Sequence, residues 1–156
     1  MKKTAFIAAL ALVGGLASQT ASADLFNIGV KAGQVSVEND TSNATAGGVV
    51  VALDIPGPIN FEGEADTTVS DGSFGSFDYS ANQMAAFATI ATPGPIYVKG
   101  RLGVARTTVD ISGLGSDNDT QAAYGLSANF GGWELGWTRT KFNGSRVDYM
   151  SLGYNF

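Results

Sequence analysis

The chain has 156 residues, with 9 Lys and Arg against 14 Asp and Glu and a formal net charge of -5. This acidic balance disfavours a nucleic-acid partner, whose phosphates attract basic side chains. The chain has no Cys and no His, which excludes disulfides, thiol chemistry, imidazole catalysis and the usual zinc sites. Most hydrolytic mechanisms are thereby excluded, and we expect no enzymatic activity, no cofactor and no metal.

Residues 1–23 have the organisation of a cleavable secretory signal peptide. Lys2 and Lys3 precede an apolar run, and Ala21-Ser22-Ala23 forms a small-residue cleavage site. The apolar run is shorter than the roughly 20 residues that a spanning helix needs. We therefore expect residues 24–156 to form one domain of an exported protein, with 7 basic residues left against 14 acidic ones.

After residue 23 the apolar residues alternate with polar ones, which predicts β-strands with one apolar face. Three polar segments between them, 36–45, 70–78 and 110–120, are expected to be loops. Tight turns are expected around Pro56, Pro93 and Gly131, and a short one at Asn143. The expected strands are, in chain order, 25–33, 46–54, 59–66, 79–91, 96–105, 121–130, 133–140 and 146–156.

Most strands have a clear pair of faces. In the fifth, Ile96, Val98 and Leu102 lie on the apolar side and Lys99 and Arg101 on the polar side. The second strand has Val49, Val51 and Leu53 as its apolar set, with less regular alternation, and the Ala-rich fourth strand does not allow its faces to be assigned.

One turn-and-strand unit occurs twice. Residues 56–64 (PGPINFEGE) are repeated by residues 93–101 (PGPIYVKGR) at an offset of 37. The repeat aligns Glu62 with Lys99 and Glu64 with Arg101, so opposite charges are expected at matched depth, two strands apart.

Eight strands with alternately tight and longer connections are compatible with a membrane barrel or with a soluble barrel such as a periplasmic carrier. Two features favour the membrane barrel. The polar faces are small, as a narrow interior requires, and the apolar faces carry aromatic residues near the tight-turn end, as an interfacial girdle would. The expected girdle consists of Phe26, Phe130, Trp133, Tyr154 and Phe156.

Residues 95–103 (PIYVKGRLG), 133–139 (WELGWTR) and 151–156 (SLGYNF) resemble the small outer-membrane β-barrel family of the opacity-protein and outer-membrane-protein-A transmembrane-domain type. The resemblance implies an all-β fold, an eight-stranded antiparallel up-and-down transmembrane β-barrel in the outer membrane of Gram-negative bacteria. It also implies that the terminal apolar residues are read by the barrel assembly machinery, after delivery by periplasmic chaperones. That assembly signal comprises Met150, Leu152, Tyr154 and Phe156. Because the sequence ends at Phe156, no peptidoglycan-binding domain is expected, and the absence of His separates the chain from lipid-modifying outer-membrane enzymes.

A polar interior would hold a network of charges that pair across the lumen, because buried charges are costly unless paired. We predict a plugged lumen from this pairing; the alternative is that the charges solvate a chain of interior water. The expected network comprises Lys31, Glu62, Glu64, Asp66, Lys99, Arg101 and Glu134.

The predicted role is structural, or a surface interaction in the envelope, with a passive channel for small solutes as the alternative and a soluble carrier third. Acids gather in the loops, as a divalent-cation site or simply as solvated side chains: Glu38, Asp40, Asp71, Asp78, Asp117 and Asp119. Arg106, Arg139 and Arg146 are candidates for contact with lipopolysaccharide phosphates. We expect a monomer.

Overall fold

The computed structural model describes residues 25–38 and 42–156. This part of the chain forms nine strands: β1 (Phe26–Val37), β2 (Ala44–Leu53), β3 (Asn60–Ser70), β4 (Gly72–Phe74), β5 (Phe77–Ala91), β6 (Ile96–Ile111), β7 (Gly115–Phe130), β8 (Trp133–Phe142) and β9 (Ser145–Asn155). Within the described residues, no helix has the length and apolar character that crossing a bilayer requires. The predicted signal peptide and Asp40 lie outside the described residues.

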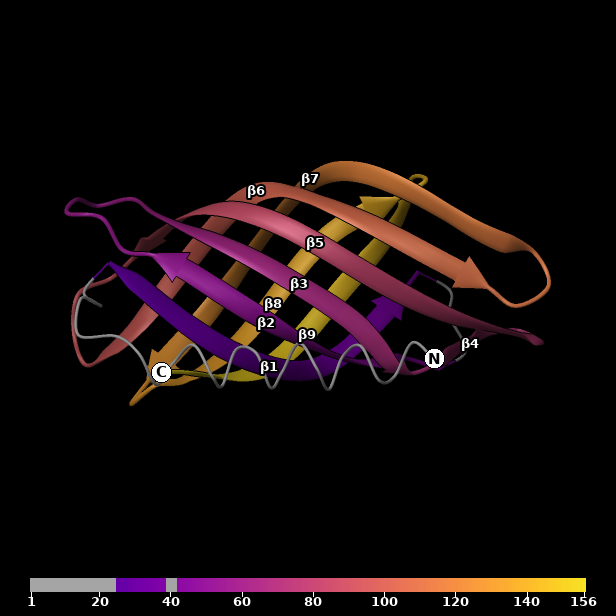
Figure 1. Cartoon of the computed structure of the whole chain (residues 1–156), viewed down its shortest axis with the longest axis horizontal. Coiled ribbons are helices and arrows are strands. Elements are labelled where there is room, and N and C mark those ends of the chain that lie inside the picture. Colours follow the sequence, from indigo (N-terminus) through magenta and orange to yellow (C-terminus); the bar gives the residue numbers. More distant parts are fainter. Residues whose placement is uncertain (1–24, 39–41) are drawn as a thin grey trace.

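The strands form one closed sheet (Figure 1). Neighbouring strands pair antiparallel in the order β3-β2-β1-β9-β8-β7-β6-β5, and pairing of β3 with β5 completes the circle. The short strand β4 also pairs with β5, beyond the end of β3. Strands β3 and β4 therefore act as one interrupted strand, and the predicted eight-stranded antiparallel barrel is confirmed.

The alternation along each strand separates an apolar outside from a more polar inside. On β6, Ile96 is 73% exposed and Leu102 66%, whereas Lys99 and Arg101 between them are 7% and 5% exposed. The Ala-rich strand β5 follows the same rule: Met84 and Ile90 point outward, and Phe87 is buried in the barrel. This assigns the faces that the sequence left open.

The outward face changes from apolar to polar at a similar height on all eight barrel strands. Between this level and the tight turns, the apolar positions cover about eight residues per strand. At about 3.3 Å per residue and a tilt near 45°, this gives an apolar band roughly 20 Å high. The first polar residues beyond the band often pair with one another, since Gln34 lies opposite Thr45, and Arg139 opposite Asp148. This polar ring consists of Gln34, Thr45, Thr67, Asn82, Arg106, Thr120, Arg139 and Asp148.

Two predicted loops are wrong. Most of 70–78 belongs to β4 and β5, and 110–120 is mainly strand, with only 112–114 between β6 and β7. Each segment contains polar and Gly residues typical of loops, but ladder pairing with its partner strand overrides that preference. The β6–β7 hairpin, orange in Figure 1, consequently extends well past the end of the β8–β9 hairpin.

The two strands of this long hairpin have different neighbours beyond the polar ring. Pairing of β7 with β8 ends at Tyr124 opposite Arg139, whereas β7 itself continues to Gly115. Pairing of β8 with β9 continues to Phe142 opposite Ser145. The barrel wall is therefore open between β7 and β8 on the side away from the tight turns.

Close packing between β5 and β6 generates a stability prediction. A Cβ atom at Gly103 would overlap the carbonyl oxygen of Ala86, whereas one at Gly63 would meet no atom within 4 Å. We expect Gly103→Ala to destabilise the barrel by about 2 kcal/mol, because the two strands must separate. The heat-dependent mobility shift of folded protein on electrophoresis measures this, with Gly63→Ala as the control. Equal unfolding temperatures for the two variants would contradict the proposed packing.

Candidate functional site: the barrel lumen

Many buried polar side chains of the described residues converge in the lumen. Its content changes along the barrel axis. A polar cavity lies at the end with the tight turns, a charge cluster follows, and an apolar cluster fills the opposite half. The strands provide this order because every second residue points inward.

One half of the charge cluster surrounds Glu64, whose side chain is completely buried. Lys31 donates a hydrogen bond to Glu64 at 2.7 Å and lies 3.1 Å from Asp66. Arg101 donates to the other oxygen of Glu64. Two cations from β1 and β6 therefore hold one carboxylate of β3.

The other half is organised by Lys99. Its ammonium group donates to Glu62 and, at 2.9 Å, to Glu134 of β8. Arg101 joins the two halves, since its guanidinium lies 3.7 Å from Glu62 and 3.8 Å from Glu134. The structure thus brings together all seven residues of the predicted charge network.

The sequence repeat explains this pairing. The Lys99–Glu62 and Arg101–Glu64 contacts both join residues 37 positions apart, which is the offset of the repeat. In the hydrogen-bond register, Glu62 lies opposite Phe87 and Phe87 opposite Gly103, four residues beyond Lys99 on β6. Barrel strands tilt by roughly 40° from the barrel axis. Residues at the same depth on strands two apart are therefore offset by a few positions in the hydrogen-bond register. Equivalent residues of the repeat therefore meet.

The cluster is not electrically balanced, since three cations face four carboxylates. Some buried acceptor atoms lack a hydrogen bond from the described residues: both oxygens of Asp66 and Oε2 of Glu62. The Lys31 ammonium is close to Asp66 but is not aligned for a hydrogen bond. The acceptors without a hydrogen bond thus belong to the first and the last of the three carboxylates that β3 contributes.

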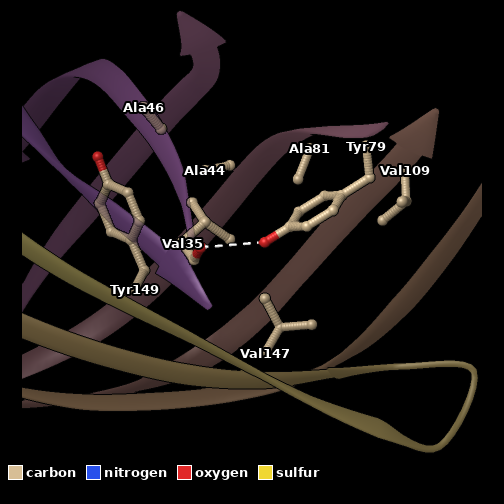
Figure 2. Close-up of a cluster of buried hydrophobic side chains, with 8 residues drawn as sticks. All are labelled: Val35, Ala44, Ala46, Tyr79, Ala81, Val109, Val147 and Tyr149. Carbon is tan, nitrogen blue, oxygen red and sulfur yellow. Dashed lines mark hydrogen bonds between the residues drawn. The ribbon is translucent and has the colours of Figure 1, made fainter. Parts of the chain in front are cut away.

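The apolar cluster was not predicted. Figure 2 shows it in the half of the barrel away from the tight turns, where the Tyr79 hydroxyl donates to the backbone oxygen of Val35 at 3.3 Å. Its members are Val35, Ala44, Ala46, Tyr79, Ala81, Val109, Val147 and Tyr149. The expected strands 25–33 and 96–105 end before Val35 and Val109, so neither residue was assigned to an inward face. Continuing the alternation through those segments would have found them.

The boundary between the charged and apolar halves is tightly filled. Lys31 lies over the ring of Tyr149, 4.6 Å from its centroid, and the Arg101 guanidinium lies 5.5 Å from the ring centroid of Phe87. Beside Asp66 a cavity of only about 10 Å³ remains, about the smallest that holds one water molecule.

At the tight-turn end the lumen widens into a cavity of about 220 Å³. Its wall is polar, and Glu62 and Lys99 of the charge cluster line its inner end. The remaining lining residues are Asn27, Ala52, Asp54, Asn60, Thr89, Ala91, Thr92, Tyr97 and Asn155.

The five aromatic residues of the expected girdle all lie at the tight-turn end and are exposed by 36% or more. Trp133 packs edge-to-face on Tyr154 at 5.2 Å, and Tyr154 on Phe156 at 5.4 Å. A third pair, Tyr124 and Trp137 at 5.9 Å, adjoins the polar ring and was not predicted. Phe26 and Phe130 contribute exposed rings at the same end as Trp133.

The three candidate arginines differ in their surroundings. Arg139 forms a two-point ion pair with Asp148, with N–O distances of 2.6 and 3.0 Å, and lies over Trp137. Arg146 also reaches Asp148, at 3.4 Å, but its side chain is 52% exposed. Arg106 is exposed and donates to Asn118. Two arginines that share one carboxylate leave a local positive charge.

The acidic residues beyond the ring have structural partners. Asp119 accepts the backbone N–H of Asn143, and Asp117 accepts its side-chain amide. The bond from Asn143 holds the pKa of Asp119 below its usual value. Glu38 accepts the backbone N–H of Arg146. The described residues contain no group of three acidic side chains placed to hold a metal ion, and Asp71 and Asp78 are exposed.

The ion pairs at the centre of the lumen generate a second prediction. Replacing Glu64 by Gln leaves Lys31 and Arg101 buried with an incomplete partner, which costs on the order of 3 kcal/mol. We expect Glu64→Gln to unfold at a lower temperature than wild type in the electrophoretic assay, and the exposed control Asp71→Asn to match wild type. An unchanged unfolding temperature for Glu64→Gln would show that the pairing is energetically unimportant.

No protein-family model and no curated protein sequence matches the chain. Solved structures with the same fold were found. Neisserial surface protein A aligns at a TM-score of 0.62 and 16% identity, over 83% of this chain and 95% of that one. Ail, the attachment invasion locus protein of Yersinia pestis, in complex with the heparin analogue sucrose octasulfate, aligns at 0.53 and 16%, over 85% and 97%. The outer membrane enzyme PagL aligns at 0.54 and 11%, over 83% and 98%. The chain therefore has the fold of the small eight-stranded barrels found in outer-membrane proteins.

Proposed function

We propose that this chain is a small integral protein of the Gram-negative outer membrane, with a structural or surface-interaction role in the envelope. The observation that carries the proposal is the inverted distribution of polarity, with apolar side chains around the outside and paired charges inside. A soluble carrier would need the opposite arrangement, because its outer face meets water. The fold shared with Neisserial surface protein A and Ail supports the same location.

We further propose that the lumen is plugged. The ion pairs of Lys31, Glu64 and Arg101 cross the interior, and the apolar cluster fills the half beyond them. Water and ions that enter the cavity at the tight-turn end would have to break several buried contacts to continue. The passive channel is therefore the second candidate.

The proposed role is not enzymatic. The chain lacks His and Cys, and the buried carboxylates of the lumen are engaged with cations rather than with a nucleophile. Because PagL has the same fold and is an enzyme, fold alone does not decide this point, and the proposal rests on the side chains that the chain has.

The proposed partners follow from the outer surface and from the end of the chain. Arg106 and Arg146 are exposed near the polar ring, where lipopolysaccharide phosphates would lie. The outward residues Met150, Leu152, Tyr154 and Phe156 form the proposed signal for the barrel assembly machinery, which receives the chain from periplasmic chaperones. The protein would act as a monomer, with its apolar band covered by lipid.

Fractionation and conductance test the proposed function together. We expect the protein in the outer-membrane fraction, resistant to extraction with carbonate and released by detergent. In planar lipid bilayers we expect no reproducible conductance steps, because the charge and apolar clusters close the lumen. Recovery in the osmotic-shock fluid would overturn the membrane assignment, and regular conductance steps would favour the channel.

Removal of Phe156 tests the proposed assembly signal. Phe156 is 64% exposed and lies beyond the last residue of β9, so its loss removes little buried area. We expect the shortened protein to reach the membrane at a much reduced level in cells, yet to unfold near the wild-type temperature after refolding in detergent. The exposed control Leu114→Ala, far from this end, should assemble normally. Normal assembly of the shortened chain would contradict the signal.

A further inference from the structure

Three of the four outward-facing cations of the described residues lie on one short hairpin, β8–β9. They are Arg139, Lys141 and Arg146, whereas the fourth, Arg106, is on β6. All four lie in or beyond the polar ring, and the remaining cations of the described residues are buried in the lumen. The outward faces of this hairpin carry only one carboxylate, Asp148. Cations therefore predominate on this hairpin, although the chain as a whole is acidic.

Two of these cations are direct neighbours. Lys141 and Arg146 lie opposite each other in the β8–β9 register, and both side chains are exposed. Opposite residues on one face of a strand pair have Cβ atoms about 5 Å apart, and two like charges in such positions destabilise the pair. Among the described residues, no hydrogen bond or ion pair engages the Lys141 ammonium. The hairpin thus holds two cations side by side with no carboxylate between them.

The nearby carboxylates are already engaged. Asp148 accepts two hydrogen bonds from Arg139, at 2.6 and 3.0 Å, and only Nε of Arg146 approaches it, at 3.4 Å. Glu38 accepts the backbone N–H of Arg146 and forms no ion pair with its guanidinium. The terminal nitrogens of Arg146 and the ammonium of Lys141 therefore remain as donors for an external anion.

The depth of this pair matches the headgroup layer of a bilayer. Arg139 and Asp148 belong to the polar ring at the edge of the apolar band, and Lys141 and Arg146 follow two residues farther out. Two residues advance about 7 Å along a strand, or roughly 5 Å in height at a tilt near 45°. Lipid headgroups occupy roughly 5 to 7 Å beyond the hydrocarbon on each side. In the proposed outer-membrane location, the pair lies at the level of the lipid phosphates.

A phosphate group fits this arrangement of donors. The planar guanidinium of an Arg can bind two phosphate oxygens through its terminal nitrogens, and a Lys ammonium adds a point charge beside it. A dianion between the two side chains also offsets their mutual repulsion. We propose that Lys141 and Arg146 together clamp one phosphate group of an outer-leaflet lipid, while Asp148 holds Arg139 aside. This inference rests on the proposed function and adds Lys141, which the sequence analysis did not select.

Lipid A, which carries phosphates, is the probe for the clamp. The folded protein in nonionic detergent micelles is titrated with diphosphorylated lipid A, and the Nε–H groups of the arginines are followed by nuclear magnetic resonance. We expect a saturable shift at Arg146 and little change at Arg139, whose Nε already donates to Asp148. The same lipid A without its phosphates should produce no shift. Equal shifts with that lipid, or saturation by inorganic phosphate at the same concentration, would overturn the proposal.

The variant Lys141→Gln removes one cation from the exposed face. We expect its affinity for diphosphorylated lipid A to fall about tenfold, the effect of losing one charge-assisted hydrogen bond, and Lys141→Arg to retain the affinity. Arg106→Gln makes the same change of net charge. Because Met84 and Thr120 rather than a second cation lie opposite Arg106, its loss should weaken binding much less. Equal losses in the two Gln variants would indicate attraction by net charge alone and overturn the clamp.

The unfolding temperature separates lipid binding from a structural role of Lys141. Without lipid A, loss of the like-charge contact should leave Lys141→Gln at least as resistant to heat as wild type in the electrophoretic assay. Diphosphorylated lipid A should raise the unfolding temperature of wild type and leave that of the variant nearly unchanged. A lower unfolding temperature of the variant without lipid A would make Lys141 a structural residue and overturn the proposal. Neither outcome bears on the membrane location, which fractionation decides separately.

Discussion

Pairing of the first strand with the last is the interaction on which the rest of the structure depends. Strands β1 and β9 pair over nine residues, from Gly29 opposite Asn155 to Val37 opposite Val147. This contact converts an open sheet into a barrel, so that the backbone groups within the apolar band find partners inside the protein. Closure also fixes the size of the interior. With eight strands there is room for side chains but little else, which is why the character of each inward residue matters.

In the narrow interior a buried charge without a partner would be costly, and the charges are accordingly paired. Charged side chains from β1, β3, β6 and β8 point at one another because no bulk water separates them. Their arrangement places two regions of different character on either side. One side is a polar cavity, and the other is a packed apolar cluster around Tyr79 and Tyr149. The barrel is thus asymmetric along its axis, although its outside is uniformly apolar across the band.

The sequence predicted the strand number, the antiparallel closure and the inward position of the charges, because a period of two is visible wherever the outward face is apolar and the inward face polar. The repeat containing Glu62 and Lys99 also predicted that these charges lie at the same level along the barrel axis, which alternation alone does not predict. Prediction failed beyond the apolar band, where the outward faces become polar and the apolar residues lie on the inward faces instead. Residues 110–120 therefore resembled a loop, and the inward Val109 was missed. The buried oxygens of Glu62 and Asp66 that lack a hydrogen bond were also beyond prediction, since they depend on side-chain geometry rather than on order along the chain.

The early end of the β7–β8 ladder leaves one edge of β7 without backbone pairing, from Gly115 to Ala123. A bare edge is a template for pairing with another chain. Here the protein's own side chains occupy part of it: Asp117 accepts the N–H of Asn118, and the hydroxyl of Thr140 donates to the oxygen of Ala122. A foreign strand would have to displace both contacts and approach past the carboxylates of Asp117 and Asp119. The exposed hairpin can therefore extend beyond the polar ring without drawing neighbouring molecules into edge-to-edge aggregates.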